Sequence, residues 1–380
     1  MRTTVFETAS VLADLGWDEL LQNGEYYSSV QWLEYLRELH SGYYHAYGAT
    51  LIDGRIQAGV SLHEVDVDSH PLIRPDACLA AWLASERSEH GSKSILPEAT
   101  ARLMPTLSLG GRTPGMTTFL HRPSLKDQEY CDLLESHLDQ AERIASDRGM
   151  RSVTLPYVDH PLMQSVLIRR GYIRYSTETN SAISLVGKSS FDDYIDHLPG
   201  HETRKRIRRD RRKVSAAGWT FQVVRLEDSP LEEICRLQAI GADQHGVPGG
   251  FEEALRKQKL SMRMLPGQSW VAIGRDVHGQ MGSCSIFIRW RDELYSRQGG
   301  EDPDLTRGYP VFFETCFYQT IEHGVATGAT SIQYSVTAAD SKRRRGCLQR
   351  TQDGYIKCLD ADDQKWLEMA TEKISPDNSS

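Results

Sequence analysis

The stretch YPVFFETCFYQTIEHGVATGATSIQYSV, residues 309–336, reads as one complete helix–turn–strand unit. Apolar residues recur at helical spacing through its first part, at Phe313, Phe317, Ile321 and Val325. Pro310 is tolerated in a first helical turn, and Gly328 is the expected C-terminal cap. Residues 331–336 then alternate as a strand does. The stretch therefore predicts a helix that leads into a strand, as in α/β proteins.

The first half of the chain repeats this order. Residues 130–148 show helical apolar spacing, Gly149 follows as a cap, and residues 153–157 read as a strand. A short helical piece and an Arg-Arg-Gly sequence come after each strand, at Arg169-Arg170-Gly171 and at Arg344-Arg345-Gly346. Self-similarity of this kind predicts that one α/β unit has been duplicated.

The fold class expected from this pattern is α/β (α+β), with two mixed sheets flanked by helices. A chain of 380 residues is long enough for two domains with separate cores. We place the domains at residues 1–187 and 188–368. A basic helix, residues 201–217, opens the second domain, and residues 369–380 are expected to be a disordered tail.

The densest charge in the chain lies in residues 204–213, which read RKRIRRDRRK. Eight of these residues are basic and one is acidic, so the segment carries a net charge of +7. The whole chain carries −8, which leaves −15 for the rest. A cationic strip on an acidic body indicates one localised site for a polyanion. The alternative is a solvated basic helix.

Guanidinium and ammonium groups bind phosphate through charge-assisted hydrogen bonds. The strip could therefore hold RNA, a pyrophosphate or a nucleotide-linked substrate. The residues assigned to polyanion binding are Arg204, Lys205, Arg208, Arg209, Arg211, Arg212 and Lys213.

Composition excludes several other classes of protein. Hydrophobic residues make up 39% of the chain, and no apolar run approaches the roughly 20 residues needed to span a bilayer. Seven cysteines without Cys-x-x-Cys spacing argue against a disulfide scaffold and a zinc module. We expect a reduced cytoplasmic protein without a metal site.

Residues 313–324 and 342–346 together resemble a known family motif. They match FEACYYQ-x-I…G…K-x-x-RG of the Fem-like branch of the GNAT acyltransferase superfamily. Residues 191–218 look like the start of that family's second lobe, and residues 29–33 are similar to the start of its first lobe. Residues 334–342 stand where the family has a GAQGEHK stretch. They keep its Lys but lack its Gly, Glu and His.

The resemblance implies two GNAT folds in tandem. It also implies transfer of an amino acid from aminoacyl-tRNA to an amine, in peptidoglycan cross-bridges or peptide-type natural products. Aminoacyl-tRNA would be the donor without a separate cofactor, and the acceptor a small-molecule or peptidoglycan-precursor amine. Two alternatives remain open: an acyl-CoA-dependent N-acyltransferase, and a non-catalytic double-GNAT protein that binds RNA or cell-wall precursors.

Four residues of the motif are candidates for the chemistry. Glu314 and Tyr318 are four residues apart and would share one helix face. Glu314 could take a proton from the attacking ammonium, and Tyr318 could protonate the leaving oxygen or orient the carbonyl. Lys342 and Arg345 could stabilise a developing oxyanion. The alternatives are a core role for Tyr318 and a surface turn for the two cations.

A Gly-rich segment precedes the motif helix. Arg297, Gln298, Gly299 and Gly300 follow a predicted strand, where a GNAT fold places its pyrophosphate loop, and a turn there could cradle a phosphate. The acids Glu301 and Asp302 weaken the case for coenzyme A, and an ordinary turn is the alternative. The predicted substrate-binding residues are Arg297, Gln298, Gly299, Gly300 and Tyr309.

Overall fold

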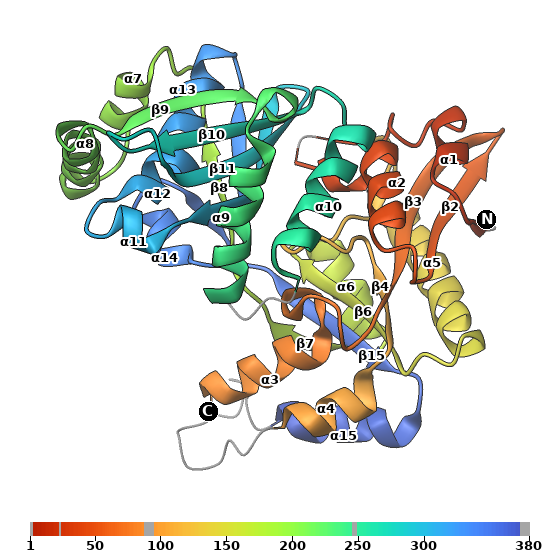
Figure 1. Cartoon of the computed structure of the whole chain (residues 1–380). Helices are drawn as coiled ribbons and strands as arrows, with labels where there is room; N and C mark the ends of the chain where they lie inside the picture. Colours follow the sequence, from red (N-terminus) through yellow and green to blue (C-terminus); the bar gives the residue numbers. More distant parts are fainter. Residues whose placement is uncertain (1–2, 23, 87–94, 245–248, 373–380) are drawn as a thin grey trace. The chain divides into compact units, whose positions relative to one another are not determined.

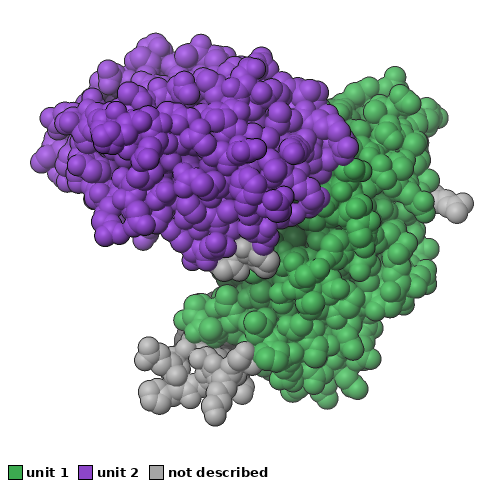
Figure 2. Space-filling view, viewed as in Figure 1, with its two compact units in different colours: residues 1–180, 350–380 green, residues 181–349 purple. Residues whose placement is uncertain are grey.

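The computed structural model describes residues 3–22, 24–86, 95–244 and 249–372. The chain forms two compact units, which Figure 2 distinguishes by colour. Unit 1 contains residues 1–180 and 350–380, and unit 2 contains residues 181–349. Each unit is built around one mixed β-sheet.

The sheet of unit 1 has the strand order β1-β2-β3-β4-β6-β15-β7, with β5 paired to β3. Its strands are β1 (Thr3–Phe6), β2 (His45–Ile52), β3 (Arg55–Val65), β4 (Thr106–Leu109), β5 (Leu120–His121), β6 (Ser152–Val158), β7 (Ile173–Ser176) and β15 (Asp353–Cys358). Its helices are α1 (Ser10–Asp14), α2 (Val30–Leu39), α3 (Pro75–Glu86), α4 (Leu96–Leu103), α5 (Asp127–Asp147), α6 (Pro161–Arg169) and α15 (Ala361–Glu372).

Helices cover both faces of this sheet. Tyr355 of β15 joins the core under α5 and α6, whereas its neighbour Ile356 joins the core that α3, α4 and α15 cover. Successive side chains of a strand point to opposite faces, so one buried strand supplies both cores.

The sheet of unit 2 has the order β14-β8-β13-β12-β11-β10-β9. Figure 1 shows its strands β9, β10 and β11 side by side. Its strands are β8 (Asn180–Ser184), β9 (Thr220–Arg225), β10 (Ser269–Arg275), β11 (Met281–Trp290), β12 (Glu293–Glu301), β13 (Ser331–Ser335) and β14 (Leu348–Arg350). Its helices are α7 (Phe191–Asp196), α8 (His201–Ala216), α9 (Leu231–Gln244), α10 (Gly250–Met264), α11 (Pro303–Thr306), α12 (Val311–Phe313), the π-helix η4 (Glu314–Tyr318), α13 (Gln319–Ala326) and α14 (Ala339–Arg343).

The two units share one plan, as the duplicated sequence pattern predicts. Strands β4 and β6 are parallel, as are β12 and β13, and a long helical segment lies in the connection of each pair. Gly149 and Gly328 follow the two connecting helices with φ of +67° and +71°, a left-handed backbone that suits glycine. A short helix and an edge strand then follow in each unit, so the predicted order is confirmed.

The division of the chain differs from the expected one because the units exchange strands. β8 follows β7 in the chain but pairs with β13 in the sheet of unit 2. β15 follows β14 but lies between β6 and β7 in the sheet of unit 1. The breaks therefore fall at residues 180/181 and 349/350, and residues 350–368 do not belong to the second unit.

The expected disordered tail, residues 369–380, is also corrected in part. Residues 369–372 form the last turn of α15, where Ala370 is buried. Residues 373–380 lie outside the described residues.

Candidate active site

The motif helix is continuous from α12 through η4 to α13 and contains one π turn. Residues five apart align along a π turn, and such turns are frequent at functional sites. Gln319 Nε2 accordingly donates to Glu314 Oε1 over 2.9 Å, and Thr320 Oγ1 donates to the carbonyl of Thr315. The π turn thus gives Glu314 a hydrogen-bond partner five residues on, Gln319.

Arg211 joins the basic helix α8 to the motif helix. Its Nε donates to Glu314 Oε1 over 3.1 Å, and its two terminal nitrogens donate to Glu322 over 3.1 and 2.9 Å. The guanidinium also lies 4.5 Å from the centre of the Phe191 ring. Arg211 is therefore occupied by carboxylates of its own unit, which corrects its assignment to the polyanion-binding face.

Glu314 is the most deeply buried carboxylate of this network. Only 2% of the residue is exposed, and its second oxygen, Oε2, has no hydrogen-bond partner among the described residues. Burial raises the pKa of this carboxyl above its ordinary value, although Arg211 opposes that rise. A buried carboxylate with one free acceptor atom and a raised pKa can act as a proton acceptor near neutral pH.

The sequence prediction missed Asp210, the one acid within the basic strip. Its side chain is buried, and Oδ2 accepts a hydrogen bond from the Tyr318 hydroxyl over 3.2 Å. Asp210 lies between Ile207 and Val214, three residues after one and four before the other, which was the available signal that it faces inward. Tyr318 is only 1% exposed, so its ring is core and its hydroxyl proton is directed to Asp210.

Arg345 lies in the same network. Its guanidinium carbon is 3.2 Å from the centre of the Phe313 ring, and a terminal nitrogen is 3.9 Å from Asp210 Oδ2. Another terminal nitrogen donates to the carbonyl of Ser341. Arg345 Nε is buried without a partner among the described residues, so one donor remains for a ligand or a water molecule.

Lys342 has a structural position rather than the predicted role at an oxyanion. Its ammonium group donates to the carbonyls of Tyr334 and Ser335 over 2.7 and 3.1 Å, and also to that of Val336. Three carbonyls match the three hydrogens of an ammonium group. The segment that it holds is strained, because Ser335, Thr337 and Ala338 have φ between +47° and +70° without being glycine.

Replacing Lys342 by Met should therefore lower stability. The substitution keeps the aliphatic stem but leaves buried carbonyls without a donor, and hydrogen bonds to charged groups contribute about 1.5–3 kcal/mol each. We expect urea unfolding to show a loss of about 4 kcal/mol or more. Arg344→Met, at an exposed neighbour, is the control and should change stability by less than about 0.5 kcal/mol. Equal midpoints for the two variants would contradict this role.

The prediction of a Gly-rich turn is wrong. The four residues assigned to it lie within strand β12, namely Arg297, Gln298, Gly299 and Gly300. A Cβ on Gly300 would lie 2.4 Å from the main chain of Leu237 in α9, and one on Gly299 would meet the Phe312 ring. These glycines therefore permit close packing of helices on the strand.

A bulge interrupts the same strand. The pairing register of β12 with β11 shifts between Ser285 and Phe287, opposite Arg297 and Gln298. Bulges re-aim side chains and are common next to active sites. Gln298 accepts a hydrogen bond from Gln258 over 3.0 Å, so its side chain belongs to the packing between β12 and α10.

The outward face of α8 carries the remaining cations. Ile207, Asp210 and Val214 face the core, whereas Lys205, Arg208, Arg209, Arg212 and Lys213 are exposed. Arg208 pairs with Asp196, but Lys205, Arg212 and Lys213 have no carboxylate partner in the part of the chain that is described. Arg204 turns inward and donates to the carbonyl of Leu198. Of the residues predicted to bind a polyanion, these five are exposed, whereas Arg204 and Arg211 contact groups of their own unit.

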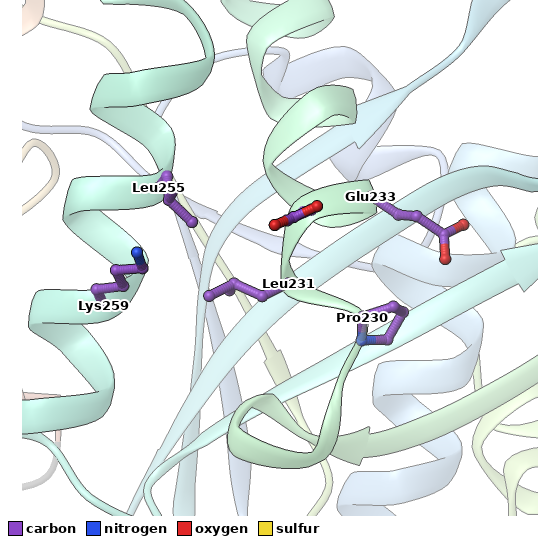
Figure 3. A pocket seen from close by; sticks show the side chains of 6 residues that line it. Pro230, Leu231, Glu233, Leu255 and Lys259 are labelled. Atoms are coloured by element: carbon purple, nitrogen blue, oxygen red, sulfur yellow. The ribbon is translucent and has the colours of Figure 1, made fainter.

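Unit 2 also contains an open pocket of about 420 Å³ between the start of α9 and the middle of α10 (Figure 3). Pro230, Leu231, Glu232 and Glu233 line one side, and Leu255 and Lys259 line the other. None of the predicted site residues lines it. Within residues 3–22, 24–86, 95–244 and 249–372, no three His, Cys, Asp or Glu side chains are grouped as metal ligands.

Comparison with protein families identifies the chain's relatives. The model of the FemAB-like family, described as peptidoglycan biosynthesis/recognition, matches residues 114–372. The chain belongs to the FemAB-like family. The matched range includes the basic helix, the motif helix and the Lys-x-x-Arg-Gly turn. No curated protein sequence matches the chain.

Solved structures show the same architecture at low sequence identity. FemX superposes over 98% of this chain and 100% of its own, with a TM-score of 0.60 and 12% identity. The C-terminal domain of a putative lysylphosphatidylglycerol synthetase from Agrobacterium fabrum covers 96% and 95%, with a TM-score of 0.54 and 12% identity. A tandem GNAT protein from the clavulanic acid biosynthesis pathway covers 94% and 99%, with a TM-score of 0.52 and 10% identity.

These similarities confirm the tandem GNAT fold of this FemAB-like protein. Family and fold together support an acyltransferase. No helix of the described residues combines the length and apolar character that crossing a membrane requires.

Proposed function

We propose that this FemAB-like protein transfers an aminoacyl group from aminoacyl-tRNA to an amine, forming an amide bond. The acceptor would be a peptidoglycan precursor or a related small-molecule amine, in keeping with the family description. The tRNA would serve as the donor substrate without a further cofactor.

This proposal rests on the two faces of helix α8. The outward face offers five cations to a phosphate backbone, and the inward face contacts the buried carboxylate of Glu314 through Arg211. One helix therefore links a surface suited to a polyanion with the proposed proton acceptor. Affinity for nucleic acid comes mainly from such contacts with phosphates.

The chemistry needs little beyond alignment and proton transfer. The amine nitrogen attacks the carbonyl carbon of the ester, and the bond from that carbon to the ribose oxygen breaks. Glu314 Oε2 accepts the proton that the ammonium loses before the attack, and this proton is later released to water. The nitrogen loses a second proton as the amide forms, and that proton passes to the departing ribose oxygen. Arg345 Nε would donate to the carbonyl oxygen as charge develops.

Charge reversal on the outward face of α8 tests the donor. We expect Arg208→Glu, Arg209→Glu and Arg212→Glu together to weaken binding of aminoacyl-tRNA strongly. The slope of log K against log salt should fall by about 0.7–0.9 for each phosphate that the variant no longer binds. Fluorescence anisotropy across a salt series measures both quantities.

A matched control separates this site from general charge effects. Lys126, Arg143 and Lys365 are three exposed cations of unit 1, and their reversal changes the net charge equally. The control should reduce affinity far less. The same loss in both triple variants, or none in the α8 variant, would rule out α8 as the donor site.

A further inference from the structure

An exposed tyrosine stands beside the cationic face of α8. Tyr309 precedes the motif helix and is 40% exposed, the only Tyr among the large exposed hydrophobic residues of the described chain. Its main-chain N–H donates to the carbonyl of Thr306 over 2.8 Å. Gly308, with φ of +80°, comes before it, and Pro310 comes after it. This constrained turn presents the ring at a fixed place.

The ring is adjacent to the basic helix. Lys213 Nζ lies 5.6 Å from the centre of the Tyr309 ring, within cation–π distance. Arg212 and Arg209 continue the exposed face from Lys213 toward the start of α8. An aromatic platform therefore lies at the end of a row of cations.

Each half of this arrangement recognises one half of a nucleotide. Cations bind phosphate, and an accessible aromatic ring stacks on a base. Bases within a duplex are already stacked on each other, so only an unpaired base can use the ring. A purely electrostatic site would need no aromatic residue.

We propose that Tyr309 stacks on an unpaired nucleotide of an RNA strand whose neighbouring phosphates lie on Lys213 and Arg212. This inference rests on the proposed function in one respect, namely that the polyanion bound by α8 is RNA. It adds that a single-stranded part of the donor lies at the C-terminal end of α8, beside the start of the motif helix.

Binding to two RNA probes tests the proposal. One probe is a short labelled single strand, and the other is a blunt two-stranded duplex with the same number of phosphates. Tyr309→Ala should weaken binding of the single strand by about 5- to 150-fold, the range for one stacked base. Its salt slope should stay unchanged because the cations still bind every phosphate. Binding of the duplex should be unaffected.

Two further variants keep the test decisive. Tyr309→Phe retains the ring and should bind the single strand as the unmodified protein does. Arg212→Gln should weaken both probes and reduce the salt slope by about 0.7–0.9. An affinity within twofold of the original for Tyr309→Ala would overturn the proposal, as would equal losses for Phe and Ala or for both probes.

The outcome is separable from that of the proposed function. Loss of stacking in Tyr309→Ala together with an absence of aminoacyl transfer would leave an RNA-binding protein without the proposed activity. Coenzyme A and free uridine diphosphate serve as competitors, and displacement of the single strand by either at micromolar concentration would overturn RNA as the occupant.

Discussion

Removal of residues 350–380 should abolish the fold of unit 1. The deletion takes away β15, which lies between β6 and β7, and also α15. The buried side chains of Tyr355, Ile356 and Leu367 would be lost with them. The free energy lost with a central strand should exceed the free energy of unfolding of a whole domain, which is roughly 5–15 kcal/mol. Circular dichroism and urea unfolding should show that the cooperative unfolding transition of unit 1 has disappeared.

A shorter truncation is the control. Ending the chain after Glu372 retains β15 and α15 and should leave the unfolding midpoint unchanged. A peptide of residues 350–372 added to the longer truncation should restore part of the lost signal, because the strand pairs by registered hydrogen bonds. A native unfolding curve for the chain that ends at Gln349 would contradict the strand exchange.

Glu314→Gln should reduce turnover by about 10²–10⁴-fold, the usual contribution of a positioned general base. Gln keeps an oxygen that can accept from Arg211 but cannot take a proton. Glu322→Gln is the matched control, since Glu322 shares Arg211 and its side chain is 41% exposed. Single-turnover transfer by the two variants gives the comparison. Near-normal turnover in Glu314→Gln would place the base elsewhere.

The pH dependence of the same residue has a definite sign. Burial raises the folded-state pKa of Glu314 above its unfolded value. Turnover should therefore rise as pH rises through that raised pKa, and Glu314→Gln should lose this rise. The contribution of the Glu314 carboxyl to the free energy of unfolding has the opposite pH dependence. It is fully present below the pKa of the unfolded state and is lost as pH rises through the pKa of the folded state. At neutral pH the buried, ionised carboxylate destabilises the folded state. Glu314→Gln should therefore unfold no more easily than the original protein.

Most of the fold could be predicted because its signals are local. Helical spacing, Gly149 and Gly328 identify the crossover helices, and the Arg-Arg-Gly sequences identify the short helices and edge strands after them. The boundary could not be predicted in the same way. The strands at residues 180–184 and 353–358 are short, and nothing in their own residues says which sheet they join. Sheet membership depends on distant partners, here β13 and β6.

The candidate site was predicted in its residue types but not in its contacts. Glu314 lies in the network as expected, yet its partners depend on a π turn that the sequence pattern does not reveal. The sequence predicts Lys342 as a ligand-binding cation, because sequence alone does not show that it faces three carbonyls. Asp210 and Arg211 belong to a charge run in the sequence, although the spacing of Ile207 and Val214 already indicates the inward face.

One transfer assay tests the proposed aminoacyl transfer most directly. Total tRNA charged with labelled amino acids is incubated with the protein and a mixture of peptidoglycan-precursor amines, in parallel with labelled acetyl-CoA. We predict that label leaves tRNA only when an amine is present and appears in a product that resists mild alkali, as an amide does and an ester does not. Glu314→Gln should slow this transfer. Label that stays on tRNA, or that enters the amines only from acetyl-CoA, would contradict the proposed function.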